Sequence, residues 1–108
     1  MPDLDRAIAD MEELLVEAGN ARAKAEAMDE RRKQVRSTMF VKYRGDGLAI
    51  GEAEHRAQAD EAYKTAAAEW ELANYDYRKT EARAVAKRLA FEAWRTEQST
   101  ERARMNLR

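Results

Sequence analysis

Residues 41–56 read VKYRGDGLAIGEAEHR, and this stretch decides the fold because it holds three of the four glycines of the chain. The glycines Gly45, Gly47 and Gly51 fall between two long segments rich in Ala, Glu, Lys and Arg, a composition typical of long helices. A left-handed residue commonly closes a helix, and glycine adopts that conformation without a clash of Cβ. Asp46, between two glycines, is typical of a turn. We therefore expect the chain to reverse direction here.

The segment before the turn predicts a helix over about 3–43. Pro2 and Asp3 are typical of a helix start. Apolar or small residues then recur at alternating steps of three and four, which is the period of a coiled coil. They are Leu4, Ile8, Met11, Leu15, Ala18, Ala21, Ala25, Met28, Val35 and Met39, and Arg32 occupies the one gap. Because Gly19-Asn20 has low helix propensity, the sequence leaves open whether this helix continues, kinks or breaks there.

The segment after the turn carries two apolar stripes. Residues 44–59 are expected to form the glycine turn and a short helix, and residues 60–104 a second long helix with Asp60 as its N-terminal cap. One stripe consists of Tyr63, Ala66, Ala67, Trp70, Ala73, Tyr77, Ala84, Phe91 and Trp94, and the other of Ala82, Val85, Ala86, Leu89 and Ala93. A helix that is apolar over two faces needs more than one neighbour. The expected core or oligomer face comprises Tyr63, Trp70, Tyr77, Val85, Leu89, Phe91 and Trp94.

Charge is distributed in four alternating blocks. Residues 1–20, 21–44, 45–74 and 75–108 carry net charges of −5, +5, −5 and +4. If the chain folds back at the glycines, facing residues have numbers that add to about 103, and each acidic block lies along a basic one. Glu13 and Glu17 then come near Arg88 and Lys87, and Arg31 and Lys33 come near Glu69 and Glu71. Parallel packing would oppose like charges, so the pattern favours an antiparallel arrangement.

The predicted fold is therefore all-α, an antiparallel hairpin of two long helices with a short helix near the turn. The length of 108 residues suits one domain, residues 1–108. Two helices share only a single-layer core, which is marginal alone. We therefore expect a homodimer that forms a helical bundle.

Composition argues against several classes of protein. The chain has no cysteine, and its single histidine, His55, lies in a polar stretch, so we expect no metal site and no cofactor. The acidic residues near the start lack the spacing of a calcium loop. No nucleophile–base set is recognisable, so we expect neither an enzyme nor a small-molecule substrate. The start lacks the layout of a signal peptide and no apolar run could span a bilayer, which predicts a cytoplasmic protein without a membrane partner.

Basic residues form two groups that could contact phosphates or a protein partner. The first group lies before the turn and consists of Arg31, Arg32, Lys33, Arg36, Lys42 and Arg44. The second group lies along the last helix and consists of Arg78, Lys79, Arg83, Lys87 and Arg88. The alternative is pairing with carboxylates of the chain itself, and we prefer that interpretation. A protein partner is therefore favoured over nucleic acid. The tripeptide Arg44-Gly45-Asp46, known from adhesion ligands, is explained by its role in the turn.

Short motifs resemble a loose group of small phage-encoded helical proteins. They are MFVKY at residues 39–43, EAEHRA at residues 52–57, ADEAY at residues 59–63 and EAWR at residues 92–95. The resemblance implies a helical hairpin and a non-enzymatic accessory role in phage DNA recombination or replication, in the bacterial host cell. It implies no catalytic residue. The alternative is a viral inhibitor of a host defence complex, of the anti-CRISPR kind, whose charge blocks would occupy nucleic-acid sites.

Overall fold

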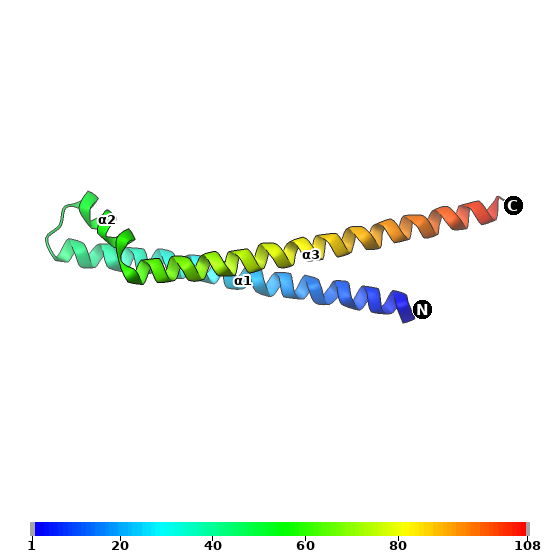
Figure 1. Ribbon diagram of the computed structural model, residues 1–108, viewed down its shortest axis with the longest axis horizontal. Coiled ribbons are helices and arrows are strands. Elements are labelled where there is room, and N and C mark those ends of the chain that lie inside the picture. Colours follow the sequence, from blue (N-terminus) through cyan, green and yellow to red (C-terminus); the bar gives the residue numbers. More distant parts are fainter. Residues whose placement is uncertain (1, 108) are drawn as a thin grey trace. The chain divides into compact units, whose positions relative to one another are not determined.

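The computed structural model describes residues 2–107 and confirms an all-α hairpin. Helix α1 spans Pro2–Gly45, α2 spans Ile50–Ala59, and α3 spans Glu61–Asn106. Figure 1 shows α1 and α3 running in opposite directions, with α2 at the turn between them. Helix α1 continues through Gly19 and Asn20, so the break that the sequence left open does not occur.

The turn is a helix cap built on one glycine rather than on three. Gly47 is the only residue of the described chain with a left-handed backbone, at φ 94°. The amide of Gly47 donates to the Arg44 carbonyl (3.0 Å) and the amide of Leu48 donates to the Tyr43 carbonyl (3.3 Å), which is the Schellman pattern. Gly45 is the last residue of α1, and Gly51 lies in the first turn of α2, so neither needs glycine for its conformation.

Alanine at position 47 is expected to destabilise the protein, whereas alanine at position 19 stabilises it. A Cβ at either site meets nothing within 4 Å, so only backbone conformation distinguishes them. Gly47→Ala forces a left-handed alanine and should cost about 1–2 kcal/mol. Gly19→Ala, inside α1, should add about 0.5–1 kcal/mol. Urea unfolding of the two variants measures both changes, and equal effects would contradict the cap described above.

The interface between the long helices is lined by small side chains. The buried residues in the described chain are all alanines, at positions 18, 25, 53, 57, 66, 73 and 84. Larger residues are only half-buried, among them Leu4, Met28 and Val35 on α1 and Tyr63, Trp70 and Phe91 on α3. Small residues let two helices approach closely, so backbone proximity replaces the thick core of a globular domain.

The predicted apolar stripe of α1 was wrong at Leu15, which does not face the other long helix. Leu15 is 48% exposed, and Leu14 is the half-buried leucine at this level. The stripe advances by four residues from Leu14 to Ala18, whereas Leu15 to Ala18 is a step of three. Either step suits a coiled coil, so spacing alone did not distinguish two adjacent leucines.

Contacts divide the chain into two compact units. The turn unit comprises Asn20–Tyr77, and the terminal unit comprises the residues up to Gly19 and from Arg78 onward. The prediction of a single domain stays a prediction. In the turn unit, Ala53 and Ala57 of α2 are fully buried, which fixes the short helix on its neighbours.

The junction of α2 and α3 is organised by Asp60, as the sequence predicted. Its Oδ1 accepts a hydrogen bond from the Ala62 amide (2.9 Å), which caps α3. Its Oδ2 accepts a hydrogen bond from the Tyr43 hydroxyl (2.7 Å), which ties the cap to α1. The hydrogen bond between Tyr43 and Asp60 joins two residues whose numbers add to 103, as predicted for facing residues of the antiparallel hairpin.

The predicted charge pairs between helices have different outcomes. Arg31 and Glu69 line the same surface hollow of the turn unit, as expected, but Lys33 pairs with Asp29 (3.4 Å) and Glu30 (3.7 Å) of its own helix. In the terminal unit, Lys87 lines a hollow with Asp3, Leu4 and Ala7, and Phe91 and Trp94 line the same hollow. The pairings of Glu13 with Arg88 and of Glu17 with Lys87 stay predictions.

Candidate interaction surfaces

Arg32, predicted as a phosphate or partner contact, belongs to the seam between the helices. Its guanidinium donates two hydrogen bonds to Asp29 Oδ1 (Nε 3.1 Å, Nη2 2.6 Å) and a third to the Tyr63 hydroxyl (3.3 Å). The same group lies 4.7 Å from the centre of the Trp70 ring, a cation–π contact. Arg32, which occupies the gap in the apolar stripe of α1, therefore has partners on both long helices. Arg32 would have to leave these partners to bind a phosphate.

This network also perturbs the titration of its members. The hydrogen bonds from Arg32, followed by those from Lys33, hold the pKa of Asp29 below its ordinary value against an opposing effect of burial. The pairing with Asp29 and then with Tyr63 raises the pKa of Arg32. Both shifts favour the charged forms of the two groups.

The other basic residues near the turn are distributed around α1. Arg44 donates to the Leu48 carbonyl (2.9 Å) and so supports the turn. Lys42 lies 5.5 Å from the centre of the Tyr43 ring. Arg31, Arg36, Lys42 and Arg44 are all exposed. The group is thus partly engaged within the hairpin, and five of its six members, all except Arg32, are exposed.

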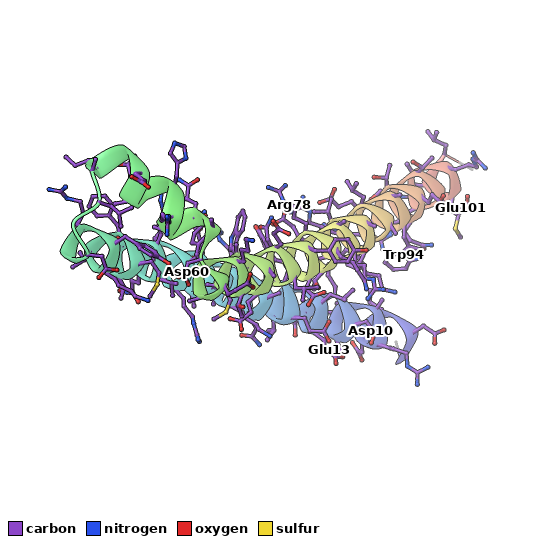
Figure 2. All side chains as sticks on the ribbon, turned by 60° about the vertical axis from the view of Figure 1, so that its left-hand side comes forward. Asp10, Glu13, Asp60, Arg78, Trp94 and Glu101 are labelled. Atoms are coloured by element: carbon purple, nitrogen blue, oxygen red, sulfur yellow. The ribbon has the colours of Figure 1, made fainter. Side chains whose placement is uncertain are left out.

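The basic residues of α3 are exposed throughout. Arg78, Lys79, Arg83, Lys87 and Arg88 all lie in the terminal unit, and Figure 2 shows Arg78 projecting outward from α3. Acidic residues including Asp10 and Glu13 project from the neighbouring part of α1 (Figure 2). Lys79, Arg83 and Lys87 stand at four-residue spacing and repel one another mildly. This row is available to carboxylates or phosphates from another molecule.

The predicted core or oligomer residues divide into two groups. Tyr63, Trp70, Tyr77 and Phe91 are half-buried between the long helices, so they belong to the seam. Val85 and Leu89 are 39% and 56% exposed and lie away from it. Trp94, also exposed, faces the hollow near the start of α1. The second stripe of α3 is therefore left without a neighbour in the described chain.

Two exposed apolar residues at the turn were not anticipated. Val41, near the end of α1, is 68% exposed, and Ile50, the first residue of α2, is 59% exposed. The signal was present for Val41, because it falls outside the three–four spacing of the α1 stripe. Ile50 follows the glycine turn, where no periodic pattern assigns a face.

The pair Tyr43–Asp60 gives this end of the hairpin a dependence on pH. The hydroxyl of Tyr43 and then the Ala62 amide lower the pKa of the Asp60 carboxyl. The same hydrogen bond raises the pKa of Tyr43. A lowered carboxyl pKa means that the contribution of Asp60 to stability is present above the unfolded pKa of about 4 and is lost as pH falls through the folded value.

We expect the wild-type protein to lose stability between about pH 5 and pH 2, with Asp60 among the groups responsible. Asp60→Asn should unfold more easily at pH 7 and should lose less on acidification. Tyr43→Phe removes only the hydroxyl and leaves the cap on Ala62 intact, so its pH dependence should lie between the two. Urea midpoints at pH 7 and pH 3 provide the measurement. Wild-type pH dependence in the Asp60→Asn variant would show that this carboxylate is not involved.

The remaining candidates for chemistry do not converge on one site. His55 is an exposed residue of α2. Within residues 2–107, no three His, Cys, Asp or Glu side chains are grouped so as to hold a metal ion. None of the helices described is long and apolar enough to cross a bilayer. The features that remain are the exposed apolar and basic surfaces.

Comparison with known proteins gives no family. No family model, no curated protein and no solved structure matches this chain.

Proposed function

We propose that this protein is a non-enzymatic interaction protein, a homodimer that binds a partner protein through the closed end of its hairpin. The observation that supports this proposal is the exposure of Val41 and Ile50 on that end. The surrounding backbone is fixed by the cap at Gly47, by the Tyr43–Asp60 hydrogen bond and by burial of α2 alanines. A surface fixed before binding loses little conformational entropy on association.

The chemistry of this end favours a partner that is both apolar and acidic. Arg44 follows Val41 by three residues, so the two lie on one face of α1. Lys42 and Arg36 add positive charge nearby in the chain. An apolar centre with a polar rim is the usual form of a protein-binding patch. Nucleic acid is the less favoured partner, because Arg32 and Lys33 are already engaged with Asp29.

The biological setting is proposed from the sequence resemblance. Two of its motifs, at residues 39–43 and 52–57, flank the turn and thus occur at the same closed end. An accessory role in phage DNA recombination or replication follows from that resemblance. Inhibition of a host defence complex is the alternative, and the identity of the captured partner distinguishes the two.

Site-specific photocrosslinking in bacterial cells tests the proposal. A photoreactive phenylalanine analogue placed at Val41 should give a discrete crosslinked partner, whereas the same analogue at Lys24, an exposed residue of α1 away from the turn, should not. Ile50→Asp should abolish the crosslink while changing the free energy of unfolding by less than about 0.5 kcal/mol, because Ile50 is exposed. Crosslinks of equal yield at both positions would contradict a binding site at the closed end.

A salt titration with single- and double-stranded DNA tests the other class of partner. We expect that any binding of DNA does not depend on Lys42 and Arg44, so removal of these two side chains should not abolish it. Affinity that falls steeply with salt and weakens in those variants would instead assign the closed end to nucleic acid.

A further inference from the structure

The second stripe of α3 forms a regular exposed seam within the terminal unit. Ala82, Ala86, Leu89, Ala93 and Thr96 follow one another at steps of four, three, four and three, which is the period of a coiled coil. All five are exposed, and Leu89 is 56% exposed. The other side of this helix is already occupied, since Ala84 is 2% exposed and Phe91 lines the hollow beside Leu4. We call these five residues the outer seam.

The outer seam is chemically suited to another helix. Four of its residues are Ala or Thr, which permit close approach of two helix backbones, and the fifth is a leucine that needs to be covered. The Thr96 hydroxyl donates to the Glu92 carbonyl of its own helix (3.1 Å), so it would not be left unsatisfied when covered. Val85, 39% exposed, borders the seam and extends its apolar area.

Charges beside the seam identify the occupant and its direction. Arg83, Ala90 and Glu97 are the residues that directly follow Ala82, Leu89 and Thr96, so they border one edge at seven-residue intervals. In an antiparallel pair centred on Ala90, Arg83 faces Glu97 of the second copy, and Glu97 faces its Arg83. In a parallel pair, Arg83 would instead face Arg78 of the second copy and Glu97 would face its Glu92, so like charges would meet.

We propose that a second copy of this chain covers the outer seam, with α3 packed antiparallel on α3 about a twofold axis at Ala90. This inference rests on the proposed homodimer and specifies its interface. The two ion pairs between Arg83 and Glu97 select the antiparallel direction, as edge charges do in coiled coils. Glu92 lies on the opposite edge of the seam, close to the axis, and therefore faces Glu92 of the second copy. Repulsion between these two carboxylates weakens the dimer.

Sedimentation equilibrium of the full-length chain and its variants tests the interface. Leu89→Glu is expected to raise the dimer dissociation constant at least about tenfold. Arg83→Glu and Glu97→Arg should each raise it about fivefold, and the double variant should return it to within about twofold of wild type. Glu92→Gln should tighten the dimer. Circular dichroism confirms that each variant remains helical, and Leu15→Glu, at an exposed site on α1, is the matched control.

Single-cysteine crosslinking tests the direction, because the natural chain has no cysteine. A short bis-maleimide should link two copies of an Ala90→Cys variant and should not link an Ala82→Cys variant, whose two copies lie far apart in an antiparallel pair. Linking of the Ala82→Cys variant would establish a parallel pair and overturn the proposed direction.

The outcomes separate this inference from the proposed function. A wild-type chain that stays monomeric refutes the dimer, whereas the crosslink at Val41 still decides binding of a partner protein. A dimer that survives Leu89→Glu refutes the outer seam as its interface and leaves the homodimer itself intact.

Discussion

An Ala57→Leu variant is expected to lose about 2–3 kcal/mol of its free energy of unfolding. Ala57 has no exposed surface, and it lies on the face of α2 that is packed in the turn unit. A leucine there has no space to occupy, so either its side chain is strained or α2 moves away from the long helices. Displacement of α2 would also pull Asp60 from Tyr43. Urea unfolding, followed by circular dichroism, measures the loss.

Ala59→Leu is the matched control for this variant. Ala59 belongs to the same short helix but is exposed, so the same added volume should change stability by less than about 0.5 kcal/mol. Equal losses in the two variants would indicate that leucine acts through helix propensity or the unfolded state rather than through packing. No loss in either would contradict the burial of α2.

A Trp70→Ala variant is expected to lose about 2–3 kcal/mol. Trp70 is the largest side chain in the seam of the turn unit, and its ring lies against the Arg32 guanidinium at 4.7 Å. Removal of the ring creates a gap between the helices and also deprives Arg32 of its cation–π partner. The value is set below that of a fully buried tryptophan because Trp70 is only half-buried. Thermal and urea unfolding together give the loss.

A double-mutant cycle with Arg32→Met separates the two contributions. Methionine keeps the length of the side chain and removes the charge, so the coupling between the two substitutions reports the cation–π contact, about 0.5–2 kcal/mol. A Trp70→Leu variant keeps a large apolar side chain, so it should retain most of the stability that packing at this position provides. A coupling of zero would show that Arg32 and Trp70 contribute independently.

The architecture could be predicted from the sequence because several local signals agree. The glycine cluster, the three–four spacing of apolar residues and the alternating charge blocks all favour an antiparallel hairpin, and the cap at Asp60 was identified by residue type. The cap at Gly47 was less specific, since three neighbouring glycines were equal candidates. Its left-handed backbone and the hydrogen bonds to the Arg44 and Tyr43 carbonyls distinguish Gly47 from the others.

The candidate surfaces were less predictable, because side-chain partners depend on three-dimensional proximity. Arg32 was recognised as the gap in the α1 stripe and was also grouped with the phosphate-contacting residues, yet its hydrogen bonds to Asp29 and Tyr63 place it inside the seam. Lys33 found carboxylates one turn away rather than across the hairpin. Pairs within one helix are always in reach, so they compete with the longer-range pairs that charge blocks suggest.

The exposure of Val85 and Leu89 was foreseen, because a helix with two apolar stripes can turn only one of them toward a single neighbour. Val41 and Ile50 were not foreseen. The exposure of Val41 could have been recognised, because this residue falls outside the three–four spacing of α1, whereas Ile50 follows the turn and belongs to no periodic pattern.

The alanine-lined seam has a calorimetric consequence. The heat-capacity increase on unfolding scales with the apolar area that becomes hydrated, and this hairpin conceals methyl groups where most domains conceal leucines and phenylalanines. A single chain should therefore show a smaller increase than the roughly 12–15 cal/mol/K per residue of ordinary domains, and a flatter curve of stability against temperature. Scanning calorimetry across protein concentrations would then reveal association directly, because burial of further apolar area between copies steepens that curve.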